Sequence, residues 1–140
     1  MSWPNYERKA GNAMDYVSGG DIPIPKGHYS PAVVHGGLVF VSGQLPVDPG
    51  GRDMTKATIE EQVRRTLANI ATILDASGSS LDRILRATVY ITDVASWPRL
   101  NAAYAEVMGE HRPARTVVPV PALHYGYLVE IDVIAAVKAP

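Results

Sequence analysis

The chain has 140 residues, no cysteine, 13 basic and 14 acidic side chains, and a formal net charge of −1. This length is typical of one domain with its own core, and the absence of cysteine excludes disulfides, thiol nucleophiles and thiolate zinc sites. A net charge near zero provides no overall basic field for nucleic acid. The longest uncharged stretches, 27–47 and 116–129, contain prolines and histidines, so neither resembles a membrane-spanning helix. The N-terminus has no apolar signal-peptide core, and we therefore expect a cytoplasmic protein.

The N-terminal residues predict an arm that leads into the domain. Residues 1–13 are polar and lack periodicity, so we expect an N-terminal arm before a domain that spans 14–140. A short strand is expected at Tyr16-Val17. Two prolines within 21–27 predict an extended segment.

A β-hairpin is predicted next. Two β-rich runs, 32–35 and 38–42, flank the dipeptide Gly36-Gly37, which is typical of a two-residue hairpin turn. The segment 46–51 contains two prolines and two glycines and is expected to be a loop.

The most regular pattern predicts a helix over 59–77. Its apolar residues recur every three or four positions, at Ile59, Val63, Leu67, Ile70 and Leu74. Thr58 and Glu61 have the spacing of a capping box, and Gly78 is expected to end the helix.

A strand and a second helix are expected after it. The strand covers 85–92, with Leu85, Ala87, Val89 and Ile91 predicted on one face. Ser96 is predicted to cap the second helix, which has Pro98 in its first turn and ends at Gly109. Its apolar side consists of Leu100, Tyr104, Val107 and Met108.

Two strands complete the chain. Residues 115–121 are β-rich but contain Pro119, which predicts an edge, bulged or interrupted strand. The last strand, 127–137, has apolar residues on both faces; one face carries Leu128, Ile134 and Ala136. The order ββαβαββ predicts an α+β fold with one sheet and two helices on one face. Because the second face of the last strand is also apolar, we expect another subunit to cover it.

Common catalytic motifs are absent. The chain has no nucleotide-binding glycine motif, and Ser42 does not lie in a nucleophile elbow. The four histidines, at positions 28, 35, 111 and 124, have no metal-ligand spacing, so surface or structural roles are favoured and no metal site is predicted.

Two charged residues in apolar surroundings stand out. Arg115 begins a long uncharged stretch and needs an anion there, which is either a structural partner such as Glu130 or Asp132, or a substrate carboxylate. Glu130 lies in the middle of a strand, so it is either ion-paired or held in a cleft where it handles a proton or orients water.

Several segments, in order, match one family over roughly residues 14–138. They are Gly27-His28-Tyr29-Ser30-Pro31-Ala32, the run from Leu38 to Pro46, Glu61-Gln62 with Leu67 and Asn69, Thr88-Val89-Tyr90 with Asp93, Asn101 with Tyr104, and Pro113-Ala114-Arg115 with Glu130-Ile131. The chain thus resembles the RidA family, also called YjgF/YER057c/UK114, of reactive-intermediate deaminases. The resemblance implies a chorismate-mutase-like fold and a homotrimeric barrel with three clefts between subunits.

The resemblance also implies an activity and a site. The activity is hydrolysis of enamines and imines, such as 2-aminoacrylate and its imine tautomers, to a 2-keto acid and ammonia, with no metal or organic cofactor. Arg115 is expected to hold the substrate carboxylate, and Glu130 to orient or activate the attacking water. The expected substrate-binding residues are Tyr29, Ser42, Gly43, Trp97, Asn101 and Val117.

The chain departs from the family pattern near this site. His28 and Pro31 flank Tyr29 in place of the usual residues, Val117 replaces a common cysteine, and Trp97 replaces a phenylalanine-like residue. The segment His124-Tyr125-Gly126-Tyr127 replaces the usual proline and polar residues. These bulky groups favour a substrate larger than the smallest imines.

Two other functions are compatible with the same resemblance. The first is a regulatory protein that binds small carboxylates without turnover. Glu130 argues against it, because a negative charge beside a carboxylate site opposes simple binding. The second is an endoribonuclease, a label that this family often carries, which the net charge of −1 disfavours.

Overall fold

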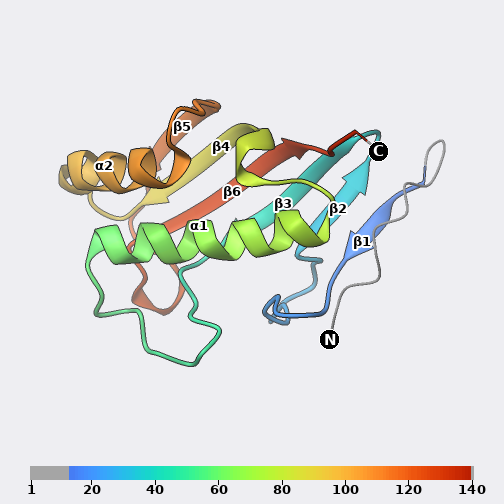
Figure 1. The fold of residues 1–140 in the computed structure, drawn as a ribbon. Coiled ribbons are helices and arrows are strands. Elements are labelled where there is room, and N and C mark those ends of the chain that lie inside the picture. Colours follow the sequence, from blue (N-terminus) through green and yellow to red (C-terminus); the bar gives the residue numbers. More distant parts are fainter. Residues whose placement is uncertain (1–12, 140) are drawn as a thin grey trace.

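The computed structural model describes residues 13–139, in which six strands form one mixed sheet and two helices pack on one of its faces (Figure 1). The strands are β1 (Asp15–Val17), β2 (Ala32–His35), β3 (Leu38–Gln44), β4 (Ile84–Ile91), β5 (Ala114–Pro119) and β6 (Val129–Ala136). The helices are α1 (Ile59–Ala76) and α2 (Trp97–Met108), and the sheet order is β1-β2-β3-β6-β4-β5. The predicted order and layering are confirmed, with β1 as the short strand expected at Tyr16-Val17. The predicted arm lies outside the described residues apart from Ala13.

The hairpin forms at the predicted glycines. Gly36 and Gly37 have φ values of 58° and 79°, as the two central residues of a tight hairpin turn require. β3 runs two residues beyond the predicted end, and its register against β6 shifts between Val41 and Gln44. Ser42 and Gly43 therefore lie in a β-bulge, a feature that re-aims the side chains near it.

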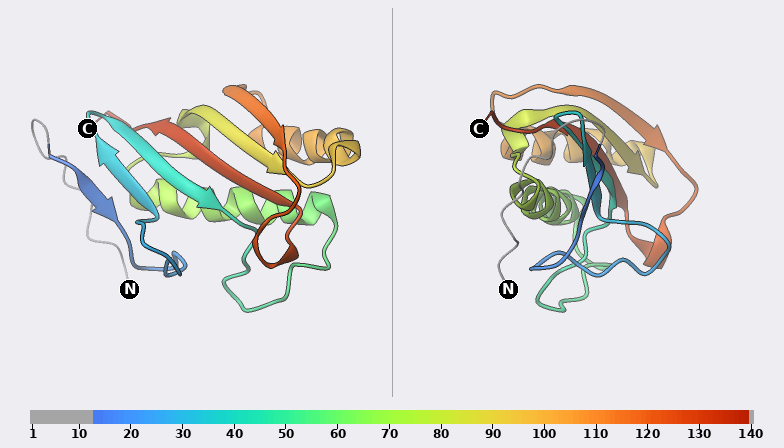
Figure 2. Two further views of the ribbon diagram at one scale, coloured as in Figure 1. Left: turned by 180° about the vertical axis from the view of Figure 1, so that it is seen from behind. Right: turned by 90° about the vertical axis from the view of Figure 1, so that its right-hand side faces the viewer.

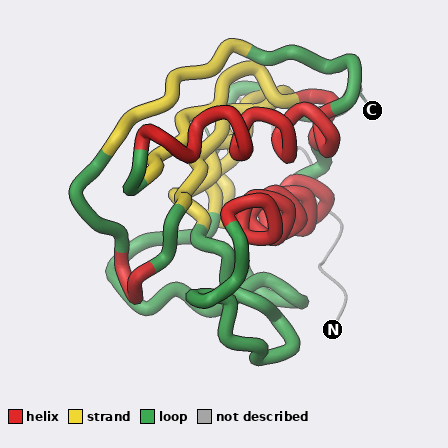
Figure 3. Tube along the Cα trace, turned by 90° about the vertical axis from the view of Figure 1, so that its left-hand side faces the viewer, coloured by secondary structure: helices red, strands yellow, loops and turns green. Residues whose placement is uncertain are grey.

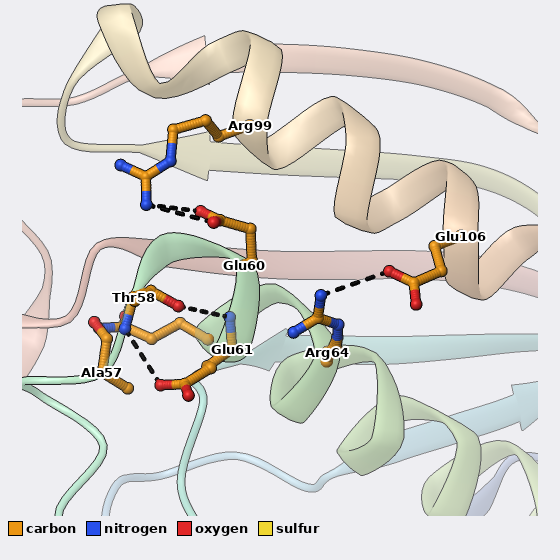
Figure 4. Close-up of polar contacts among 8 residues, drawn as sticks. Ala57, Thr58, Glu60, Glu61, Arg64, Arg99 and Glu106 are labelled. Carbon is orange, nitrogen blue, oxygen red and sulfur yellow. Dashed lines mark hydrogen bonds and ion pairs between the residues drawn. The ribbon is translucent and has the colours of Figure 1, made fainter.

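Both ends of α1 follow the predicted signals. The Thr58 side chain accepts a hydrogen bond from the Glu61 amide, and the Glu61 carboxylate accepts one from the Thr58 amide (Figure 4). The helix ends at Ala76, one residue before the predicted end, with Ser77 as its C-cap residue, and Gly78 has a φ of 76°. The amide of Ser79 then donates to the Leu74 carbonyl at 2.8 Å, which satisfies a carbonyl of the last turn.

The start of α2 differs from the prediction. Ser96 makes no side-chain capping bond, because it lies in helical conformation at the end of a 3₁₀ turn, Val94–Ser96, that leads directly into the helix. Asp93 takes the capping role one turn earlier by accepting from the Ala95 amide. Pro98 lies in the first turn, and Gly109 ends the helix, as expected.

Surface ion pairs join α2 to α1. Arg99 lies 2.8 Å from Glu60, and Arg64 lies 3.3 Å from Glu106 (Figure 4). Exposed pairs of this kind contribute little energy individually. They nevertheless join the two helices on the side away from the sheet, and α2 carries residues of the candidate site.

One residue of β4 faces the opposite way from its prediction. The register against β6 shifts between Ile84 and Arg86, so a bulge at Leu85 places Ile84 in the core and leaves Leu85 50% exposed. From Ala87 onward the predicted alternation is confirmed, with Val89 and Ile91 fully buried.

The sheet has a helix face and an open face. The helix face packs against α1 and α2 to form the core, to which β6 contributes Val129, Ile131, Val133 and Ala135. Neither of the two α-helices of the described chain lies on the open face (Figures 2 and 3). There Phe40 is 43% exposed and pairs in register with Ile134. None of the helices within residues 13–139 has the length and apolar character needed to span a membrane.

Candidate functional site

Glu130 lies in a cavity on the open face of the sheet, at the end of β6 nearest the bulge. The cavity has a volume of about 340 Å³. Its lining residues are Lys26, Gly27, Tyr29, Ser42, Gly43, Leu45, His124, Tyr125 and Glu130. The predicted residues Tyr29, Ser42, Gly43 and Glu130 thus come together in one place, which we call the Glu130 cavity.

The bulge in β3 makes room for the Glu130 carboxylate. A Cβ atom added at Gly43 would collide with Oε1 of Glu130, so only glycine leaves this space free. Ser42 is held from the other side, because its amide donates to the Pro31 carbonyl at 2.9 Å and its hydroxyl donates to the Ser30 carbonyl at 2.6 Å. The bulge therefore places backbone directly against the carboxylate.

The surroundings of Glu130 favour its protonated form. Burial raises the pKa of Glu130 above its usual value of 4.5; the charge of Asp132 adds to this rise, and His124 opposes it. Asp132 lies two residues along the same face of β6 and accepts a hydrogen bond of 3.0 Å from the Tyr90 hydroxyl. A carboxyl group with a raised pKa beside a cavity holds a proton more readily than an ordinary glutamate, which suits a group that accepts and then returns a proton.

Arg115 lies on the other face of the sheet. It pairs in register with Ala87 of β4, whose side chain is buried beneath the helices. Its Nη2 atom donates to Oδ1 of Asn101 at 2.9 Å, and its guanidinium carbon lies 4.7 Å from the centroid of the Tyr104 ring. Both partners come from α2, so α2 orients the guanidinium.

A cavity of about 430 Å³, which we call the Arg115 cavity, opens beside this arginine. It is lined by Asn101, Tyr104, Ala105, Met108, Gly109, His111, Arg112, Pro113 and Arg115. Among residues 13–139 no carboxylate forms an ion pair with Arg115, so the alternative of a structural pair with Glu130 or Asp132 is wrong within this chain. The guanidinium is held in place by neutral groups and is available to an anion.

Val117 and Trp97 lie on the Arg115 side of the molecule. Val117 follows Arg115 on the same face of β5 and packs against the core. Trp97 is the first residue of α2, one turn before Asn101, and is 41% exposed; it lines neither the Glu130 cavity nor the Arg115 cavity. Six of the predicted residues thus form two groups, with Tyr29, Ser42, Gly43 and Glu130 around one cavity and Asn101 and Arg115 around the other, whereas Val117 and Trp97 line neither cavity.

Three further residues belong to these groups and were not predicted. Tyr104 had the spacing of a core residue of α2, but its ring supports Arg115, and its buried hydroxyl has no hydrogen-bond partner in the described part of the chain. Lys26 and Tyr125 line the Glu130 cavity. The unusual segment from His124 to Tyr127 was the only signal in the sequence that pointed to Tyr125.

Comparison with known proteins places these features in a family. The model of the family described as "Endoribonuclease L-PSP", which comprises the YjgF and RidA proteins, matches residues 20–137. The chain belongs to the RidA family. A RutC family protein of Pyrococcus horikoshii, PH0854, is 42% identical over 115 residues, which cover 82% of this chain and 91% of that protein.

Solved structures of family members share the fold. RidA from an Antarctic Psychrobacter superposes with a TM-score of 0.82 at 32% identity, covering 88% of this chain and 99% of that one. Escherichia coli TdcF with bound serine has a TM-score of 0.81 at 33% identity, covering 89% and 99%. The predicted YjgF-like α+β fold is thereby confirmed. Within residues 13–139 no group of three or more metal-ligating side chains is found.

Proposed function

We propose that this RidA-family protein hydrolyses enamines and imines derived from amino acids to a 2-keto acid and ammonia. The observation that carries the proposal is the state of its two charged groups. Arg115 is held by Asn101 and Tyr104 without an acidic partner in the described chain, and Glu130 is half-buried with a raised pKa beside a cavity. A free guanidinium suits a substrate carboxylate, and such a carboxyl group suits proton transfer.

We place the complete site between two chains of a homotrimer. Arg115 and Glu130 face opposite sides of one sheet, so one chain cannot present both to one small molecule. Family membership favours a trimer with clefts between subunits. The apolar groups Phe40 and Ile134 on the open face support the proposal, since they would be buried by a neighbouring subunit.

The proposed reaction follows from the chemistry of these groups. Arg115 of one subunit binds the substrate carboxylate through its two parallel N–H donors, and Asn101 and Tyr104 keep it in position. Glu130 of the neighbour accepts a proton from water as the water oxygen bonds to the imine carbon. That proton passes from Glu130 to nitrogen and gives a carbinolamine. Glu130 then takes the carbinolamine hydroxyl proton and returns it to nitrogen, so that the C–N bond breaks, ammonia leaves and the keto group forms.

We assign the remaining predicted residues to the two sides of the proposed site. The backbone of Ser42 and Gly43 lies beside the Glu130 carboxylate and can hydrogen-bond near the reacting nitrogen. Tyr29 lines the same cavity, while Val117 and Trp97 lie on the Arg115 side. An imine is already electrophilic, so positioning the water and the carboxylate supplies much of the rate without a cofactor.

Turnover is favoured over simple binding, although both use Arg115. The bound serine of TdcF supports recognition of small amino-acid-like carboxylates in this family. A protein that only bound such anions would gain nothing from Glu130, because its negative charge repels them. Ribonuclease activity receives no support from a chain of net charge −1.

The decisive experiment measures imine hydrolysis directly. An amino-acid oxidase generates the imine in the assay, and formation of 2-keto acid and ammonia is followed above the uncatalysed rate. We expect a clear acceleration by the wild-type protein, with Arg115→Ala lowering kcat/KM by at least about 100-fold. Arg99→Ala, which removes an exposed arginine of the α1–α2 surface, is the matched control and should leave the rate unchanged.

Glu130→Gln separates the competing functions. Loss of turnover with retained binding of a 2-keto acid supports the proposed role in water activation. A wild-type protein that binds 2-keto acids but never accelerates hydrolysis would contradict the enzyme and favour the regulatory alternative. Cleavage of RNA without imine turnover would favour the ribonuclease.

A further inference from the structure

A second cavity adjoins the Glu130 cavity and has a different chemical character. Its volume is about 380 Å³, which lies within the range of small-molecule pockets. Its lining is rich in apolar and aromatic groups, among them Ile24, Tyr29, Val47, Tyr125 and Tyr127. We call it the aromatic subsite.

The aromatic subsite is continuous with the proposed reaction centre. Five residues line both cavities: Lys26, Tyr29, Gly43, Leu45 and Tyr125. Gly43 also lies against the Glu130 carboxylate. A molecule whose reacting carbon sits beside Glu130 can therefore extend a substituent past Tyr29 and Tyr125 into the subsite.

Tyr125 is held in this wall at a cost to the backbone. Its φ is 63°, and it is the one non-glycine residue of the described chain with positive φ. The left-handed conformation is unfavourable for a residue that carries a side chain. Such strain at an exposed position points to a role in binding, because it persists only where the surroundings hold it.

The neighbours of Tyr125 fix its ring. The ring packs edge-on against Tyr127 with centroids 6.2 Å apart, and Nζ of Lys26 lies 5.3 Å from its centroid. Tyr125 nevertheless remains 61% exposed, and Ile24, which lines the same cavity, is 88% exposed. These surfaces are arranged around a space that nothing in the described chain fills.

We propose that the aromatic subsite receives the side chain of the substrate, and that this protein prefers imines with an aromatic or long apolar side chain. The inference rests on the proposed imine hydrolysis for its reacting end and on the subsite for its specificity. Apolar walls reward burial of a large side chain, and tyrosine rings add edge-on contacts with an aromatic one. An imine derived from alanine would leave the subsite empty.

The test compares one large and one small substrate in matched variants. The oxidase assay is run with phenylalanine and with alanine as imine sources, on the wild type, Tyr125→Gly and Tyr16→Ala. Glycine tolerates a φ of 63°, so Tyr125→Gly removes the ring while relieving the backbone. Tyr16→Ala removes an exposed tyrosine of β1 that lines neither cavity.

The expected result is a change in selectivity. The wild type should favour the phenylalanine-derived imine, and Tyr125→Gly should lower the ratio of kcat/KM for the phenylalanine-derived imine to kcat/KM for the alanine-derived imine about tenfold. Tyr16→Ala should change neither. Equal losses on both substrates, or a wild-type preference for the alanine-derived imine, would overturn the inference.

A binding measurement keeps this test independent of turnover. Phenylpyruvate and pyruvate are titrated into the wild type and Tyr125→Gly. Tighter binding of phenylpyruvate that Tyr125→Gly abolishes supports the subsite even where no imine is hydrolysed, in which case only the proposed reaction fails. Equal binding of the two acids by the wild type contradicts the subsite.

Discussion

Arg115 and Glu130 lie on opposite faces of the same sheet. Arg115 pairs in register with Ala87, which is buried under the helices, whereas Glu130 pairs with Tyr90 on the open face. In a β-sheet, residues aligned across strands share a face, so this arrangement follows from the register itself. A reaction that needs both groups is therefore expected to use two chains.

Tyr104 is expected to act through Arg115. Replacing it with leucine removes the ring under the guanidinium and should raise KM about tenfold, the scale of a desolvated cation–π contact, with little change in kcat. Tyr104→Phe keeps the ring and should keep KM within about twofold. Steady-state kinetics on both variants checks this, and equal effects of the two changes would contradict the role of the ring.

Gly43 is expected to be required for activity rather than for folding. Alanine at this position would push the Glu130 carboxylate aside, because the collision involves the end of a flexible side chain. We expect Gly43→Ala to lower kcat about 100-fold, as for a misplaced catalytic group, while the Tm stays close to that of the wild type. Gly50→Ala in the loop after β3 serves as the control. A large drop in the Tm of Gly43→Ala would show a structural role instead.

The pH dependence of the reaction should report the state of Glu130. As a proton acceptor it must be ionised, so kcat/KM should fall as the pH drops through its pKa. Because burial and Asp132 raise that pKa above 4.5, the fall should begin at higher pH than for an ordinary glutamate. Asp132→Asn removes the like charge and should move the fall to lower pH, whereas His124→Asn should move it to higher pH. Profiles that coincide for all three proteins would contradict this assignment.

The raised pKa of Glu130 also determines how this residue affects the stability of the folded protein at different pH values. Since the pKa of Glu130 is raised in the folded state, the favourable contribution of the protonated form is complete below the usual pKa and is lost as the pH rises through the raised one. Glu130→Gln is therefore expected to increase the free energy of unfolding near neutral pH more than at acidic pH. Chemical denaturation at the two pH values measures the difference.

Local patterns predicted most of the fold. Alternation and helical periodicity identified the strands and helices, and the capping box at Thr58 and the glycine at Gly78 defined α1. The predictions were wrong where contacts with other segments of the chain determine the local structure. The bulge at Leu85 depends on the register with β6, and the missing cap at Ser96 depends on a preceding 3₁₀ turn. Neither leaves a local signal in the sequence.

For the candidate site too, the sequence predicted what local patterns reveal and missed what contacts between distant segments decide. Arg115 and Glu130 were recognisable because charged groups in apolar strands need a reason to be there. Their separation onto two faces depends on the pairing of β5 with β4 and of β6 with β4, which joins segments far apart in the sequence. Tyr104 was hidden because a tyrosine on the apolar side of a helix has the pattern of a core residue.

Complementation between two inactive variants tests the central claim most directly. Arg115→Ala and Glu130→Gln chains are unfolded together, refolded as a mixture and assayed for imine hydrolysis, with refolded wild type and each variant alone as controls. If every site takes Arg115 from one subunit and Glu130 from its neighbour in a ring of three, each mixed trimer contains one intact site, and an equal mixture should recover roughly a quarter of wild-type activity. A mixture as inactive as the separate variants, while its trimers are shown to be mixed, would contradict a site shared between chains.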